Sequence, residues 1–160
     1  MVKKLLLVAI LFTGLVACKS KSAFNFSEQI VAKERSLEPE ITATENKVEK
    51  FAQAGQFDSM AAVSERMEKL VQTKIDEIED MKVPNAKEAD AFKSATLKYF
   101  KYIKSIYTGY KGVGNAKTDE EREQLASDLM ELANKKNTVL SDMQAAQQKY
   151  AKANGFKVQK

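Results

Sequence analysis

The 160-residue chain contains no histidine and a single cysteine, and these two scarcities exclude several classes of function. Di-iron bundles need Glu-x-x-His pairs, histidine-ligated haem and Cys/His zinc sites need those side chains, and nucleophilic triads need a base that is absent here. Glycine-rich phosphate loops are missing too, because Gly112 and Gly114 stand without the rest of a dinucleotide motif. We therefore predict a protein that is not an enzyme and binds no cofactor or metal.

Carboxylates are plentiful, but their densest cluster is not expected to bind a cation. Asp76, Glu77, Glu79 and Asp80 lie almost next to one another in a segment predicted to be helical. Neighbouring helical residues point in different directions, so these oxygens do not converge on a calcium ion. We interpret the cluster as a solvated helix face.

The position of the lone cysteine suggests a use other than a disulfide. Lys3 and Lys4 precede an apolar run from Leu5 to Val16, which is the layout of a secretory signal peptide. The run is about 12 residues long, whereas a bilayer-spanning helix needs about 20. A transmembrane anchor and an ordinary secreted signal with an incidental cysteine are the two alternatives.

The end of this run, Leu15-Val16-Ala17-Cys18, resembles the lipobox of bacterial lipoproteins. The resemblance implies cleavage after Ala17, so that residues 1–17 are a signal peptide, and a diacylglycerol on the sulfur of Cys18. Two acyl chains hold a protein stably on a membrane. Lys19 stands where some inner-membrane lipoproteins carry a retention aspartate. We therefore expect a lipid-anchored protein of the bacterial cell envelope, on the outer membrane and facing the periplasm or the surface.

Charge gives no reason to expect a nucleic-acid partner. The formal net charge of +4 includes Lys3 and Lys4, and without them the chain carries 24 basic against 22 acidic side chains. A nearly neutral exported domain lacks the excess of cations that a phosphate backbone attracts. The membrane is the first partner that we expect, through Cys18, and nucleic acid is not one.

Apolar residues recur at alternating steps of three and four along four segments, which predicts helices that pack as a bundle. Residues 18–26 are expected to be a lipidated tether that leads into a bundle domain at 27–160. The helices are expected at about 28–54, 59–82, 86–111 and 119–154. Short connections between them favour an all-α, antiparallel up-down-up-down four-helix bundle.

Three residues on these apolar stripes leave the local structure open. Pro39 lies within the first segment, whose helix either continues through it with a kink or starts there, and the unbroken apolar phase favours continuity. Glu34 occupies a position on the same stripe. Lys136 lies on the stripe of the fourth helix, where it either extends its charge to the edge of the bundle or marks a loosening of residues 134–137.

Several residues predict where the helices begin and end. Gly55 and Gly155 are expected to be left-handed and to close the first and fourth helices, with Phe156 packing on Tyr150 as in a Schellman motif. The remaining predicted ends are Asp58 capping the second helix, Asn85 and Glu88 as a capping box for the third, Gly112 and Gly114 closing the third, and Thr118 with Glu121 as a capping box for the fourth.

Two groups on the predicted third helix are candidate binding residues. Lys101, Lys104 and Lys111 fall on one side, opposite the apolar stripe, with Tyr102 off the stripe, and this surface suits an anionic glycan, a lipid headgroup or an acidic protein surface. The alternative is an ordinary charged exterior. The second group is a candidate polar pocket, lined by Tyr99, Tyr107, Tyr110 and Met143, because buried tyrosines need hydroxyl partners. The alternative there is simple core filling.

Beyond the lipobox, the chain resembles a family of small helical bacterial surface lipoproteins without assigned activity. The resemblance rests on the helical layout of residues 27–158, on Tyr99-Phe100 and on the closing segment from Tyr150 to Phe156. It implies an envelope-attached helical protein and supplies no catalytic residues. The expected function is to present a bundle to a protein or glycan partner in the envelope. The alternatives are a small-ligand carrier that uses the tyrosine pocket and a structural spacer in an envelope complex.

Overall fold

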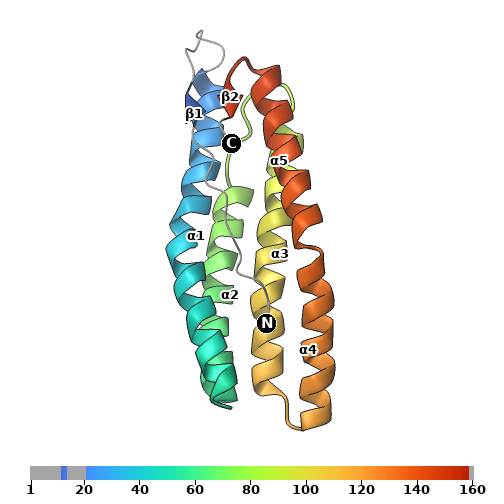
Figure 1. Ribbon diagram of the computed structural model, residues 1–160. Helices are drawn as coiled ribbons and strands as arrows, with labels where there is room; N and C mark the ends of the chain where they lie inside the picture. The colour runs from blue at the N-terminus through green and yellow to red at the C-terminus, as the bar shows by residue number, and fades with distance from the viewer. Residues whose placement is uncertain (1–11, 14–20, 159–160) are drawn as a thin grey trace.

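Five helices in four rods make up most of the computed structural model, which describes residues 12–13 and 21–158. The helices are α1 (Lys21–Gln53), α2 (Phe57–Glu79), α3 (Ala89–Asn115), α4 (Asp119–Asn134) and α5 (Lys136–Ala153). Only Lys135 separates α4 from α5, and the two together form the fourth rod (Figure 1). The predicted all-α four-helix bundle is confirmed.

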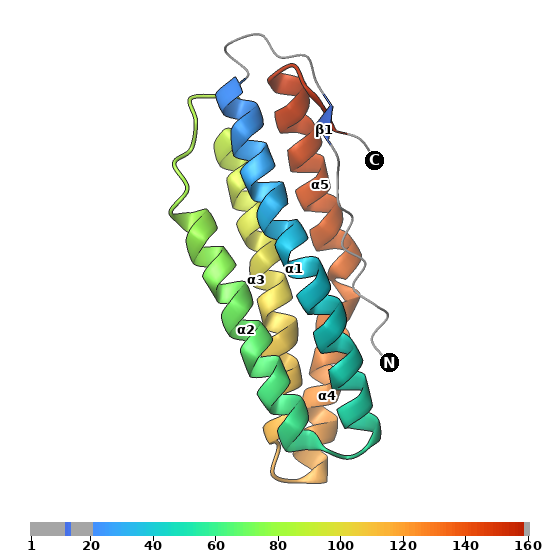
Figure 2. The same cartoon turned by 90° about the vertical axis from the view of Figure 1, so that its left-hand side faces the viewer.

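Each rod returns alongside the one before it, as Figures 1 and 2 show. Side-chain contacts show that α2 and α3 run in opposite directions. Lys101 on α3 reaches Glu79 at the end of α2, whereas Thr108, further along α3, reaches Glu68, which lies earlier in α2. We call one end of the bundle the Lys21 end; it holds the start of α1, the end of α2, the start of α3 and the end of α5. The other end, with the turns at 54–56 and 116–118, is the Gly55 end.

The hydrophobic core has two parts. The central core fills the middle of the bundle with aliphatic and aromatic side chains from all five helices. A second group, which we call the aromatic end cluster, lies at the Lys21 end and comprises Ala23, Phe26, Ile30, Ala89, Phe92, Tyr150, Ala151 and Phe156. The rings of Phe92 and Tyr150 stack with centroids 5.1 Å apart, and the Phe26 ring meets that of Tyr150 edge-on at 6.1 Å.

The first helix starts earlier than predicted because its first turns belong to the aromatic end cluster. It begins at Lys21, so the prediction of a tether through residue 26 is wrong for residues 21–26. Ala23 and Phe26 are buried, and burying a phenylalanine side chain stabilises a fold by about 2–3 kcal/mol. The helix also continues without a break through Pro39, as the unbroken spacing of apolar residues on both sides of the proline predicted. Leu37 and Ile41 pack in the core on both sides of the proline.

Three of the predicted helix ends are confirmed. Gly55 (φ +64°) and Gly155 (φ +78°) are left-handed, and glycine reaches this conformation without a steric penalty. In the second case the N–H of Phe156 donates to the carbonyl of Ala151 at 3.1 Å, which is the Schellman pattern. Thr118 accepts a hydrogen bond from the N–H of Glu121 through its side-chain oxygen at 3.1 Å.

The other predicted ends are wrong. The N-cap of α2 is Gln56 and not Asp58, and α3 starts at Ala89 after a left-handed Glu88 rather than with a capping box from Asn85. Gly112 and Gly114 lie inside α3, because this helix continues to Asn115 where it packs against the start of α2.

The second helix ends at Glu79, before the predicted residue 82, and a side chain from another helix satisfies its last carbonyls. The ammonium group of Lys93 donates to the carbonyl oxygens of Glu79 and Met81, each at 2.7 Å. Carbonyls at a helix C-terminus lack partners within the helix, so a cation there is favourable. No local pattern in the sequence of α2 could show this contact.

The fourth rod is interrupted where Lys136 lies on its apolar stripe. Lys135 forms a turn between α4 and α5, so the helix does loosen within residues 134–137, which was one of the two alternatives, and the loosening is confined to this one residue. Lys136 itself is half-buried, and burial lowers the pKa of its ammonium group, with the Glu45 carboxylate opposing this effect. Because Lys136 is the first residue of α5, directly after the turn, its side chain can extend its ammonium group to the edge of the bundle.

Two short strands accompany the helices, although the sequence predicted none. Strand β1 (Phe12–Thr13) pairs antiparallel with β2 (Lys157–Val158), with Phe12 opposite Val158 and Thr13 opposite Lys157. β1 thus comes from the predicted signal peptide and β2 comes after the closing turn of α5. Among the described helices none combines the length and the apolar composition that crossing a bilayer requires.

Candidate functional site

The predicted lipidation residue, Cys18, lies outside the described residues, and its modification stays a prediction. The nearest described residue on its C-terminal side is Lys21. This residue, three positions further along the chain, is already the first residue of α1. The bundle therefore begins almost directly after the predicted anchor.

The three lysines of the predicted surface on α3 make contacts with α2. They do not form a free surface on the side of α3 opposite its apolar stripe. The ammonium group of Lys101 lies 2.8 Å from a carboxylate oxygen of Glu79, and Lys104 donates to the side-chain carbonyl of Gln72 at 2.7 Å. Lys111 forms an ion pair with Glu68. These three lysines therefore join α3 to α2, so that two of them are already matched by acids within the molecule.

Tyr102 lies off the predicted apolar stripe, yet it is not a surface residue. Its side chain is buried, and its hydroxyl donates to the carbonyl of Ala133 on α4 at 3.4 Å. The reason is that α3 contacts every other helix of the bundle. A helix surrounded in this way has several buried faces, whereas the prediction assumed a single apolar stripe.

The candidate pocket residues lie in or against the central core. Tyr99, Tyr107 and Met143 are buried there, and Tyr110 is half-buried with its ring 6.1 Å from that of Tyr107. Burial raises the pKa of the Tyr99 and Tyr107 hydroxyls, so both stay protonated at neutral pH. The hydroxyl of Tyr107 has no hydrogen-bond partner within the part of the chain that the structure describes. The pocket itself stays a hypothesis.

A buried carboxyl group is the most perturbed acid at the described positions. Glu34 on α1 is only 5 % exposed. Burial raises the pKa of its carboxyl to about 7, with a smaller contribution from the nearby Glu38 carboxylate and an opposing one from Arg35. Its Oε1 atom has no hydrogen-bond partner among the described residues. The carboxyl is thus neutral in mildly acidic solution and becomes a buried anion as the pH rises.

We expect Glu34 to make stability depend on pH. An unfolded glutamate ionises near pH 4.5, and the folded one near pH 7, so the folded state binds the proton more tightly. The free energy of unfolding is therefore highest below pH 4.5 and falls as the pH rises through 7, by about 3 kcal/mol in all. Urea denaturation at a series of pH values from 4.5 to 8 should show this fall in the unaltered chain and a flat profile in Glu34→Gln. Glu38→Gln removes only the smaller of the two contributions that raise the Glu34 pKa, so it should keep most of the fall. An equal slope in all three chains would contradict the assignment.

A surface hollow between α1 and α2 was not predicted from the sequence. It has a volume of about 290 Å³. Its lining residues are Glu40, Thr44, Lys47, Val63, Arg66, Met67 and Leu70. Val63 and Met67 are buried, while the charged residues are exposed and of both signs. The hollow is just below the size of typical ligand sites and includes none of the four candidate pocket residues.

Metal binding has no support from the described residues, because no three Asp, Glu, Cys or His side chains gather there as a ligand set. The comparisons with known proteins give no further assignment. No family model, no curated protein and no solved structure matches the chain.

Proposed function

We propose that this protein is a non-catalytic lipoprotein of the bacterial cell envelope, anchored through Cys18, which presents its helical bundle to a protein or glycan partner. The observation that carries the proposal is the segment Leu15-Val16-Ala17-Cys18 at the end of a short apolar run. The absence of histidine and the single cysteine support the non-catalytic part, because the common nucleophilic and metal-dependent mechanisms need those side chains.

The fold is compatible with such an anchor. The 33 residues of α1 make a rod about 50 Å long at 1.5 Å per residue. With the lipid at Cys18, the Lys21 end lies next to the membrane and the Gly55 end can extend away from it. The exposed acids Glu120 and Glu121 at that far end are then available to a partner. Cleavage after Ala17 would also remove β1 from β2.

The mass of the mature protein tests the anchor. Expressed in a bacterium and purified from membranes, the protein should start at Cys18 and exceed its amino-acid mass by a diacylglycerol and an acyl chain. Cys18→Ala, or treatment with globomycin, should leave an uncut precursor. A mature chain with the mass of its amino acids alone, or normal processing of Cys18→Ala, would overturn the lipid anchor.

A small-ligand carrier is the second candidate, favoured by the buried hydroxyl of Tyr107, which has no hydrogen-bond partner among the described residues. The same purified protein distinguishes the two, because a carrier would retain a small molecule in a mass spectrum recorded under non-denaturing conditions. A spacer in an envelope complex, the third candidate, would instead copurify with a protein and hold no small molecule.

A further inference from the structure

Five exposed lysines gather at the Lys21 end from segments that are far apart in the sequence. They are Lys21 on α1, Lys82 and Lys87 in the α2–α3 connection, Lys152 on α5 and Lys157 on β2. Each lies within two positions of a residue that forms or packs against the aromatic end cluster. The side chain of Asn154 also donates to the carbonyl of Lys87 at 2.9 Å, which joins the α2–α3 connection to the end of α5.

None of these five lysines has an ion-pair or hydrogen-bond partner for its ammonium group among the described residues. Other cations at the same end are occupied: Lys149 lies 3.0 Å from a carboxylate oxygen of Glu88, and Lys93 closes the end of α2. Among the described residues, the acids of this end without an ion pair are Glu28, Asp76, Asp80 and Asp90. The free cations therefore outnumber the free acids.

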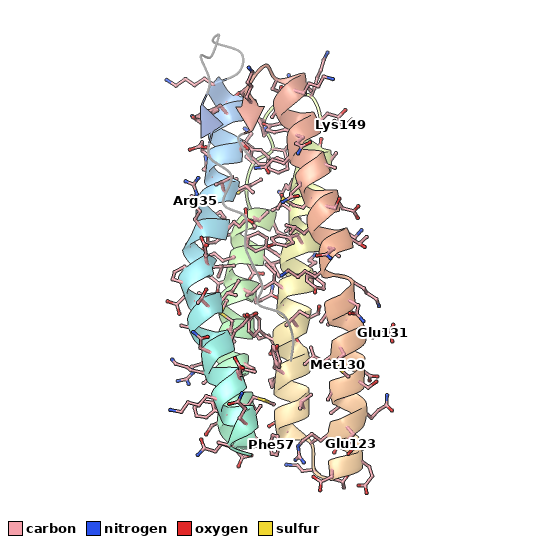
Figure 3. The ribbon with its side chains drawn as sticks, viewed as in Figure 1. Arg35, Phe57, Glu123, Met130, Glu131 and Lys149 are labelled. Carbon is pink, nitrogen blue, oxygen red and sulfur yellow. The ribbon has the colours of Figure 1, made fainter. Side chains whose placement is uncertain are left out.

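The opposite end of the bundle carries more acids than bases, because residues 49–60 and 111–123 hold six acidic and four basic side chains. The first turn of α4 carries Asp119, Glu120 and Glu121, and Glu123 comes soon after them. Figure 3 shows Glu123 at the Gly55 end, with Phe57 beside that end, and Lys149 near the Lys21 end. The two ends therefore differ in their balance of charge, with cations in excess at the end nearest Cys18 in the sequence and acids in excess at the end farthest from it.

The distance from the predicted anchor brings the basic end within reach of a charged membrane. The three residue steps from Cys18 to Lys21 span at most about 11 Å, even when fully extended. The Debye length in physiological salt is about 8 Å, and charges farther apart than this are largely screened. Because about 11 Å is the upper limit of the span, Lys21 can lie close enough to anionic headgroups to be attracted by them.

We propose that the Lys21 end is a membrane-docking surface whose lysines contact anionic phospholipid headgroups, so that the rod stands with its basic end on the bilayer. The proposal rests on the proposed lipid anchor for its orientation. The surface itself consists of Lys21, Lys82, Lys87, Lys152 and Lys157 and exists without the lipid. A lysine near an anionic surface strengthens binding by about fivefold, so the five together act as a second membrane signal.

Vesicle cosedimentation tests the surface separately from the lipid. The chain from residue 18 onward with Cys18→Ser keeps all five helices and both core clusters, and circular dichroism first verifies its helical content. It should bind vesicles with about one third phosphatidylglycerol, fail to bind pure phosphatidylcholine vesicles, and dissociate in high salt.

Two variants of equal charge change locate the binding surface. Lys82→Gln, Lys87→Gln and Lys152→Gln combined should weaken binding to the anionic vesicles by at least tenfold. Lys47→Gln, Lys50→Gln and Lys117→Gln combined remove the same charge from exposed lysines toward the Gly55 end and should leave binding nearly unchanged. Equal losses in both variants, or no preference for anionic vesicles, would overturn the docking surface. Neither result affects the mass measurement at Cys18, so the anchor and the surface fail independently.

Discussion

Tyr150→Ala is expected to lower the free energy of unfolding by about 4 kcal/mol, because it empties the middle of the aromatic end cluster. The Tyr150 ring is fully buried and contacts the rings of Phe26, Phe92 and Phe156. Its hydroxyl donates to the carbonyl of Ala23 at 2.8 Å across 127 residues of chain. The substitution therefore removes packing and also the contact that holds the first turn of α1 to the last turns of α5.

Two further variants separate these contributions. Tyr150→Phe keeps the ring and removes only the hydrogen bond, so it should cost about 1 kcal/mol. Met130→Ala truncates a side chain that is 55 % exposed on α4, labelled in Figure 3, and should change stability by less than about 0.5 kcal/mol. Urea denaturation followed by circular dichroism measures all three. If Tyr150→Ala were no more costly than Tyr150→Phe, the end cluster would not be packed as described.

Gly114→Ala is expected to destabilise the bundle by about 2 kcal/mol, although alanine is the better helix former. A Cβ atom at this position would lie 2.7 Å from the carbonyl oxygen of Phe57 and 2.8 Å from both the Cβ and the backbone nitrogen of Ala61. These are mainly backbone atoms at the start of α2, so α2 and α3 would have to move apart to make room.

Gly112→Ala is the matched control, because it makes the same chemical change two residues earlier in the same helix. There the nearest atoms to the new Cβ are the methyl groups of Leu125 at 3.9 Å, which is an ordinary van der Waals distance. We expect a gain of about 0.5–1 kcal/mol from the reduced backbone entropy of the unfolded chain. Thermal or urea denaturation should therefore show shifts of opposite sign, and a stabilising Gly114→Ala would show that α2 and α3 do not approach so closely.

Local sequence signals predicted the parts of the structure that depend on a few neighbouring residues. Gly55 and Gly155 close their helices, and Thr118 opens α4, through hydrogen bonds that span no more than five residues. The continuity of α1 through Pro39 was predicted from apolar phase alone. Such features could be predicted because the backbone geometry of one helical turn determines them.

The candidate site was harder to predict, because its residues obtain their surroundings from other helices. Tyr102 and Lys104 are only two positions apart in the sequence, yet Lys104 reaches Gln72 on α2 and Tyr102 reaches Ala133 on α4. A single apolar stripe cannot predict this, since α3 is enclosed by helices on several sides. Gly114 likewise lies inside α3, and does not end it, because this part of α3 packs against the start of α2.

By itself, the sequence determined the helical class, the number of rods, the turns at Gly55 and Gly155, and the lipobox-like segment that ends at Cys18, because periodicity and short-range geometry are properties of the chain. Tertiary structure alone decided which lysines are paired and which are free, where α1 begins, and that cations from four separate segments meet at one end. Those properties arise from contacts between residues tens of positions apart, and only packing brings such residues together.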